Sequence, residues 1–246
     1  VTRTTIFNIN TTTSNSTSHA SNANASDASS DDLTPLVLIG PGTGVAPMRA
    51  LILERIRSLR RINTTTTTTT TSDLPLSLLL FYGCRKRDED FLYHKEWLSD
   101  ETCGGLGFKK IIDKEGELLL QKIINKHRIE IHCAFSRDIP LYNQTPDKGG
   151  RMYVTKLIKS RADDIQSMLL PSGGDCSDNK NKNKNKVGRV FVAGSAKRMP
   201  SDVRRAIKDA LCRTSSRKNS WMSIREEEEV EKLLAFMTKH KNYYVE

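Results

Sequence analysis

Short apolar runs recur along the chain, and each is bounded by glycine, proline or charged residues. Four of them are PLVLIG (35–40), LSLLLFYG (76–83), IEIHCAFS (129–136) and GRVFVAG (188–194). They alternate little between apolar and polar positions, which predicts strands that are covered on both faces, as in a parallel sheet. A shorter segment, NYYVE (242–246), is expected to add a fifth strand.

Segments with the apolar spacing of a helix lie between and after these runs. In residues 46–62, Pro47 stands in the first turn, where its missing N–H is tolerated, and the apolar side chains form one stripe. The other predicted helices span 151–170, 199–213 and 223–240. Strand followed by helix, repeated, predicts an α/β fold with a doubly wound, mainly parallel sheet of five strands.

Three tracts are too polar to contribute to a core. Residues 1–33 are predicted to be a disordered tail, because they cannot bury enough apolar area to offset the loss of conformational entropy. A threonine tract at about 63–73 and an asparagine-lysine tract at about 172–186 interrupt regular structure, so both are predicted to be surface loops. We therefore expect one domain, residues 34–246.

The formal charge of +10 makes a phosphorylated ligand or a nucleic acid a candidate partner. Four of the lysines lie in residues 179–186, which contain no apolar residue, and this favours a solvated loop over a binding stripe. The five cysteines include no C-x-x-C pair and the histidines show no ligand spacing, so no metal site is predicted. No apolar run approaches the roughly 20 residues of a membrane helix, and the expected location is the cytoplasm.

The turn after the first predicted strand, GPGTGVAP (40–47), contains three glycines in five residues and leads into a helix. Val45 stands where the dinucleotide fingerprint G-x-G-x-x-G needs its third glycine, and no Gly-Lys-Ser/Thr follows to make a P-loop. Taken alone, the turn is equally compatible with a structural role and with a phosphate bound at the helix N-terminus.

Three further turns carry groups that suit a nucleotide. Arg85 follows the second strand and offers a fork of donors, although the charged run around it is also typical of a solvated turn. Ser136 and Arg137 leave the third strand together, and a hydroxyl beside a guanidinium suits a phosphomonoester. Phe91, Leu92 and Tyr93 are expected to enter the core where a helix begins after the second turn.

The remaining candidates lie in RMYV (151–154) and in the turn VAGSAKRMPSDV (192–203). Arg151 supplies a second cation, and the ring of Tyr153 suits stacking on a base. The small residues around Gly194 allow a flat ring to approach the backbone closely.

In this order, the motifs GPGTGVAPMR, YGCRKRDEDFLY, AFSRD, RMYV and VFVAGSAKRMPSDVR resemble the NADP-binding domain of the ferredoxin-NADP reductase superfamily. Within it they look most like the diflavin reductases that serve cytosolic iron-sulfur cluster assembly. The resemblance covers about residues 34–246 and implies the cofactor-binding residues Gly42, Thr43, Arg85, Ser136, Arg137, Arg151, Tyr153, Gly194, Asp202 and Glu246.

The resemblance also implies roles for these residues. Gly42 and Thr43 would contact the pyrophosphate or the nicotinamide half of NADPH, with Arg85 nearby, and Tyr153 would stack on the adenine. The 2'-phosphate would be held by Ser136, Arg137 and Arg151. Asp202 and Glu246 match family positions near the cofactor, whereas Ala193 stands where microsomal-type relatives have a catalytic cysteine, so no catalytic residue is assigned.

The activity implied is that of an NADPH-dependent flavin oxidoreductase: hydride passes from NADPH to FAD, and electrons then pass through FMN to an iron-sulfur or haem protein. The FAD and FMN domains of the family are not recognised in this chain, so we expect them in cis or in trans, with the chain either a fragment or a free-standing module. Two alternatives stay open, a catalytically incomplete interaction domain and a basic nucleic-acid-binding protein.

Overall fold

The structure is a computed structural model. It describes residues 33–61, 74–112, 117–138, 151–170, 187–194, 198–212 and 227–246. The predicted tail up to residue 32, both low-complexity loops and Cys176 lie outside these ranges, so the predictions for them stay predictions.

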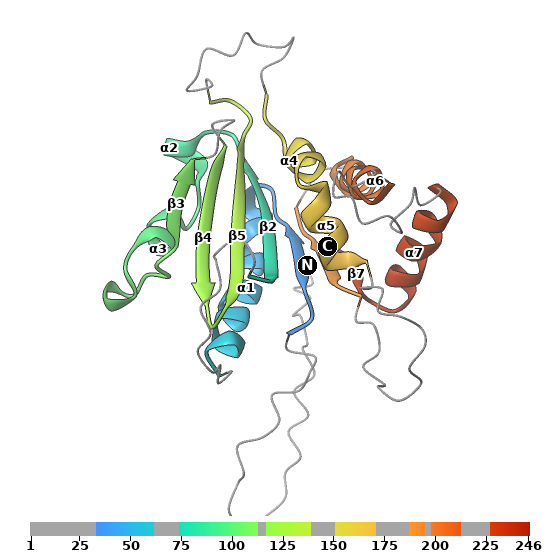
Figure 1. The fold of residues 1–246 in the computed structure, drawn as a ribbon. Coiled ribbons are helices and arrows are strands. Elements are labelled where there is room, and N and C mark those ends of the chain that lie inside the picture. The colour runs from blue at the N-terminus through green and yellow to red at the C-terminus, as the bar shows by residue number, and fades with distance from the viewer. Residues whose placement is uncertain are drawn as a thin grey trace, which may run out of the picture.

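The described residues form one sheet in the order β3-β4-β5-β2-β1-β6-β7 (Figure 1). The five predicted strands are confirmed as β1, β2, β5, β6 and β7, and neighbouring members of this group pair in parallel. The strands are β1 Leu36–Ile39, β2 Leu76–Cys84, β3 Lys109–Ile112, β4 Leu118–Ile124, β5 His127–Phe135, β6 Arg189–Val192 and β7 Tyr243–Val245.

The prediction of five strands was wrong in number, because β3 and β4 extend one edge of the sheet in antiparallel register. Every residue of β3 is exposed, so its sequence lacks the apolar run that marked the other strands. The turn from β4 to β5 is made by Asn125 and Lys126 with φ of 45° and 65°. Hairpins with such turns are usually recognised by a glycine, which is absent here.

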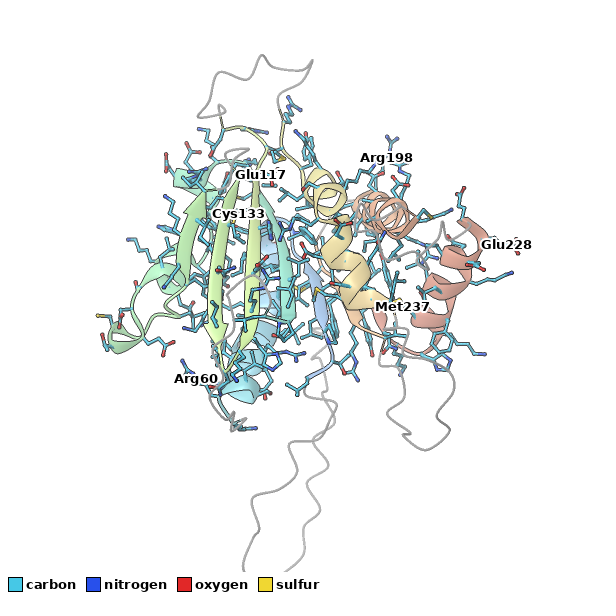
Figure 2. All side chains as sticks on the ribbon, in the orientation of Figure 1. Arg60, Glu117, Cys133, Arg198, Glu228 and Met237 are labelled. Atoms are coloured by element: carbon cyan, nitrogen blue, oxygen red, sulfur yellow. The ribbon has the colours of Figure 1, made fainter. Side chains whose placement is uncertain are left out.

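Helices cover both faces of the parallel part of the sheet, as a doubly wound fold requires (Figure 1). α1 packs on one face with β1, β2, β4 and β5, and α4, α5, α6 and α7 pack on the other. The helices are α1 Val45–Arg61, α2 Arg87–Asp90, α3 His94–Leu98, α4 Val154–Ser160, α5 Ala162–Leu169, α6 Met199–Cys212 and α7 Glu227–Lys239, with short 3-10 helices η2 Gly42–Gly44 and η4 Glu101–Cys103. Figure 2 shows Cys133 and Met237 in the interior and Arg60 and Glu228 at the periphery.

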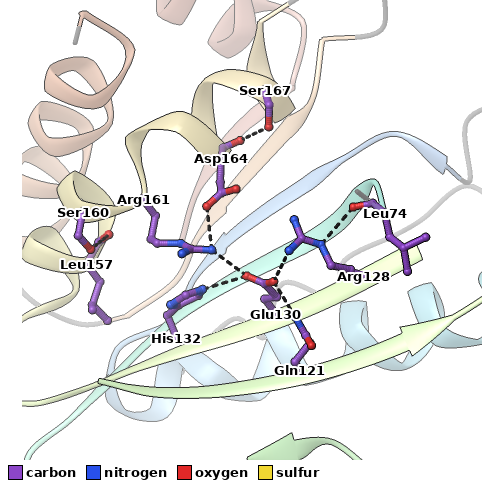
Figure 3. A network of polar contacts seen from close by, with 10 residues as sticks. All are labelled: Leu74, Gln121, Arg128, Glu130, His132, Leu157, Ser160, Arg161, Asp164 and Ser167. Carbon is purple, nitrogen blue, oxygen red and sulfur yellow. Dashed lines mark hydrogen bonds and ion pairs between the residues drawn. The ribbon is translucent and has the colours of Figure 1, made fainter. Parts of the chain in front are cut away.

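The predicted single helix over 151–170 is two helices, because the chain leaves helical geometry at Arg161, where φ is −105° and ψ is 31°. The Arg161 side chain turns toward the sheet there and binds Glu130 of β5 with an Nη2 to Oε2 distance of 3.1 Å (Figure 3). A partly buried ion pair therefore lies at the point where the chain bends from α4 into α5.

Glu130 is the centre of a polar network on this face of the sheet (Figure 3). Its side chain is 1% exposed and also lies 3.1 Å from Arg128 Nη1 and 3.2 Å from His132 Nε2. Burial alone would raise the pKa of Glu130, but the His132 hydrogen bond and the charges of His132, Arg161 and Arg128 outweigh it and lower the pKa to about 2. The carboxylate is thus kept ionised inside the protein.

The expected burial of the 91–93 segment is only partly correct. Phe91 is buried, whereas Leu92 and Tyr93 are 40% and 37% exposed. The backbone of Tyr93 is left-handed with φ of 61°, and α3 begins only at His94. This turn can direct one of its three side chains into the core, and the other two face outward.

Candidate functional site

A pocket of about 710 Å³ lies where the parallel strands end. Its walls come from the turns after β1, β2 and β5, from α2, and from the first turns of α4 and α6. The chain runs from β1 outward through β2 to β5 and then returns to β6 on the other side of β1. Such a reversal of strand order is where open α/β sheets bind their ligands.

The glycine turn forms the pocket wall next to α1. Gly42 has φ of 59°, and the space beside its Cα is open, so its backbone is accessible. Gly44 lies against β6, because a Cβ at this position would overlap the carbonyl oxygen of Ala193. The turn therefore packs closely against the end of β6, and its residues Pro41, Gly42 and Thr43 line the pocket.

The turns after β2 and β5 are joined by backbone hydrogen bonds that continue beyond the strands. Ser136 N donates to Cys84 O at 3.0 Å, and Arg137 N donates to Arg85 O at 2.8 Å. Ser136 and Arg85 line the pocket, and Arg137 is exposed beside them. Three of the predicted residues are thereby brought to one edge of the pocket.

The guanidinium groups of Arg85 and Arg137 at this edge of the pocket differ in their surroundings. The Arg85 guanidinium lies 3.1 Å from an oxygen of Asp90 and lowers the pKa of that carboxyl group. Arg137 forms no salt bridge with another described residue, and its charge contributes less than that of Arg85 to the lowered pKa of Asp90. Arg137 therefore fits an added anion better than Arg85 does.

The other predicted residues differ in how close they lie to the pocket. Tyr153 immediately precedes α4, lines the pocket and is 49% exposed, and Asp202 in the first turn of α6 also lines it. Arg151 is exposed and lies two residues from Tyr153. Gly194 faces Pro41 and Met199, and Glu246 donates its N–H to Val192 O at 2.9 Å, so both lie at the adjoining end of β6 and neither lines the pocket.

Comparison with known proteins agrees with this arrangement. The family described as "Oxidoreductase NAD-binding domain" matches residues 38–102, which include the end of β1, the glycine turn, α1 and β2. This match supports the assignment of residues 38–102 to an NAD-binding domain of an oxidoreductase.

Similar proteins include two kinds of reductase. The domain is 31% identical to a protein named NADPH--cytochrome P450 reductase from Phanerodontia chrysosporium over 180 residues, which are 73% of this chain and 18% of that protein. It is 30% identical to proteins named NADPH-dependent diflavin oxidoreductase 1 from Schizosaccharomyces pombe over 173 residues (70% of this chain, 19% of that protein) and from Xenopus laevis over 181 residues (74% and 20%). The chain spans about a fifth of the length of these relatives.

Several residues of the NAD-binding domain's pocket were not predicted. Thr155, Leu92 and Arg198 all line it, and Arg198 projects at the pocket end of α6 (Figure 2). Arg198 could have been recognised in the sequence, because it is a cation directly before the helix predicted at 199–213. It lies in the motif VAGSAKRMPSDV (192–203), of which only the small residues were considered. The other two lie on segments whose approach to the pocket depends on how the helices pack.

The thiols near the pocket of the NAD-binding domain do not have the properties of nucleophiles. Cys84 lines the pocket, and burial raises the pKa of its thiol to about 12. Burial also raises the pKa of Cys133 well above its ordinary value. Since the thiolate is the reactive form, both cysteines have the character of packing residues.

No group of three or more His, Cys, Asp or Glu side chains that could bind a metal occurs among the described residues. Across the same ranges, no helix has both the length and the apolar character required to cross a bilayer.

Proposed function

We propose that this domain binds NADPH in the pocket and presents its nicotinamide to a flavin of a diflavin reductase. The observation that carries the proposal is that one pocket joins the glycine turn at the N-terminus of α1 to the Ser136–Arg137 turn after β5. NADPH carries phosphate at two separate places, the pyrophosphate and the 2'-position. The two turns offer donors for each of them.

The 2'-phosphate is assigned to the turn after β5. Ser136 Oγ is a hydroxyl on the pocket wall that donates a long hydrogen bond to Cys84 O at 3.4 Å, and Arg137 adds a guanidinium that forms no salt bridge with another described residue. A guanidinium can donate two parallel hydrogen bonds to a phosphate, which makes this interaction stronger and more directional than one with a lysine. Arg151 is proposed as the second cation.

The pyrophosphate is assigned to the glycine turn. The free N–H groups of Gly42 and Thr43 lie where the 17-residue helix α1 begins, and the partial positive charge of a helix N-terminus favours an anion there. The first turn of α1 contains no acidic residue that would oppose this. The open space beside Gly42 lets a phosphate approach the backbone, so the residues present fit the ligand.

The two rings of NADPH are assigned to opposite sides of the pocket. Tyr153 has an exposed ring in the wall next to the 2'-phosphate turn and is proposed to stack on the adenine. The nicotinamide is proposed to lie toward the end of β6, with Asp202, Gly194 and Glu246 around it. This orientation directs the reactive ring toward a partner flavin.

The flavin supplies the redox chemistry, since FAD accepts hydride and FMN passes single electrons onward to an iron-sulfur or haem protein. We propose that both flavins are held outside the described residues and that the acceptor is a cytosolic protein of iron-sulfur cluster assembly. The similarity to proteins named NADPH-dependent diflavin oxidoreductase supports the use of two flavins. The contribution of this chain is to bind and orient NADPH.

Isothermal titration of the full chain with NADPH and NADH tests the proposal. NADPH is expected to bind at least tenfold more tightly, the scale of one well-formed phosphate contact. Equal affinity for the two nucleotides would refute the assignment of the 2'-phosphate. Absence of binding by either would refute the proposed function and leave the interaction-domain and nucleic-acid-binding alternatives.

A further inference from the structure

Arg87 and Asp138 connect the turns after β2 and β5 behind the pocket. Arg87 N donates to Asp138 Oδ1 at 3.2 Å, and Arg87 Nε lies 3.8 Å from Asp138 Oδ2. The Arg87 guanidinium also stacks on the ring of Phe135 with its Cζ 4.7 Å from the ring centre. Phe135 and Asp138 flank Ser136 and Arg137, so Arg87 contacts the turn on both sides of the proposed phosphate ligands.

Neither residue of this pair is a good candidate for a ligand group. Arg87 and Asp138 do not line the pocket, and their side chains are only 24% and 28% exposed. The backbone bonds from Ser136 to Cys84 and from Arg137 to Arg85 join the same two turns that the pair connects. The pair therefore acts on the turn itself.

The charge of Asp138 makes this arrangement informative. A carboxylate two residues from Ser136 repels a phosphate bound there, so ligand binding alone gives no reason for an acidic residue at this place. The contacts of Asp138 explain the acidic residue, because its carboxylate joins the end of the turn to the backbone and side chain of Arg87.

We propose that Arg87 and Asp138 are a positioning pair that holds the Ser136–Arg137 turn in the conformation that binds the 2'-phosphate of NADPH. The inference rests on the proposed function. It identifies residues that determine the preference for NADPH over NADH without touching either nucleotide.

Titration of the full-length Asp138→Ala and Asp138→Asn variants with NADPH and NADH tests the pair. A positioning role predicts a higher Kd for NADPH in the variants, whereas repulsion by the carboxylate predicts a lower one. Loss of the contacts is expected to raise the Kd of Asp138→Ala for NADPH about tenfold, the scale of a charge-assisted hydrogen bond, and to leave the Kd for NADH within twofold. Asp138→Asn keeps an oxygen that can accept from Arg87 N, so its Kd for NADPH is expected between those of the wild type and Asp138→Ala. If only charge mattered, both variants would bind NADPH more tightly.

A matched control is Glu101→Ala, which removes an exposed carboxylate that pairs with Arg60 and Lys122 and does not line the pocket. It is expected to leave both Kd values unchanged. If Asp138→Ala does not fold, as judged by circular dichroism, Asp138→Asn alone decides, because a Kd for NADPH at or below the wild-type value overturns the proposal.

The pair is also overturned if Asp138→Ala weakens NADPH and NADH by the same factor, which would indicate a general structural role. This result differs from failure of the proposed function. A wild-type chain without preference for NADPH overturns both, whereas a wild-type preference that survives in Asp138→Ala overturns the positioning pair alone.

Discussion

The buried carboxylate of Glu130 predicts a stability that is lost in acid. Replacement of Glu130 by Gln keeps the size of the side chain but removes the negative charge that faces Arg128 and Arg161. Arg161 retains Asp164 at 2.8 Å, and Arg128 retains a hydrogen bond to Leu74 O at 3.1 Å. The variant is therefore expected to fold, with a lower free energy of unfolding.

The magnitude follows from the pKa of Glu130, which falls from its ordinary value of 4.5 to about 2 in the folded protein. At about 1.4 kcal/mol per pH unit, this difference corresponds to roughly 3 kcal/mol of stability at pH 7. Removal of one partner from a buried ion pair costs a similar amount, about 3–5 kcal/mol. Because the folded pKa is depressed, the contribution is complete above pH 4.5 and is lost as the pH falls toward 2.

Urea unfolding of the wild type and Glu130→Gln at pH 7 and pH 3 measures this contribution. The difference in free energy of unfolding is expected to be about 3 kcal/mol at pH 7 and less than half of that at pH 3. Glu101→Gln is the control, since this carboxylate also pairs with two cations but is exposed, and a loss of no more than about 1 kcal/mol is expected. Equal losses in the two variants at pH 7, or a difference that persists at pH 3, would refute the reasoning.

Three further predictions concern the pocket. Gly44→Ala should lower the free energy of unfolding by more than about 2 kcal/mol in urea titrations, because the added Cβ overlaps the Ala193 carbonyl. Gly42→Ala has open space beside it and should cost only the roughly 1–2 kcal/mol of a left-handed backbone. Similar losses in the two variants would contradict the contact between Gly44 and Ala193. The buried thiol of Cys84 should resist iodoacetamide at pH 8 in the folded chain, while the exposed Cys103 reacts. Labelling is measured for each cysteine by peptide mass, and rapid labelling of both would show that the pocket thiol is accessible. Tyr153→Ala should raise the Kd values for NADPH and NADH by a common factor of about 5 to 150 in calorimetry, since base stacking contributes about 1–3 kcal/mol. A change for NADPH alone would place the ring at the phosphate instead.

The parallel part of the fold could be predicted because burial on both faces leaves an unmistakable apolar run, as in Leu76–Cys84, where nearly every residue is buried. The antiparallel edge could not, because an exposed strand such as β3 needs no apolar run and the turn at Asn125 and Lys126 uses no glycine. The helix break at Arg161 was equally hidden, since the side chain at the break bonds Glu130, 31 residues away in the chain.

The residues of the candidate site also fall into two groups, those that the sequence could predict and those that it could not. Residues on strand ends and in the turns that follow them, such as Gly42 and Ser136, could be placed from the chain alone, because parallel strands bring their carboxyl ends to one edge of the sheet. Residues that reach the pocket through helix packing, such as Arg198 and Thr155, could not. The Arg87–Asp138 pair depends on two turns lying side by side, which becomes visible only when β2 and β5 are paired.

The central claim is that the turn after β5 recognises the 2'-phosphate, and the ratio of the Kd for NADH to the Kd for NADPH tests it most directly. This ratio is to be measured for the wild type, for Ser136→Ala combined with Arg137→Ala, and for the exposed control Arg57→Ala. The ratio is expected to be at least about 10 in the wild type and the control and to fall to near 1 in the double variant, through weaker binding of NADPH alone. A ratio that stays at the wild-type value after both side chains are removed would contradict it.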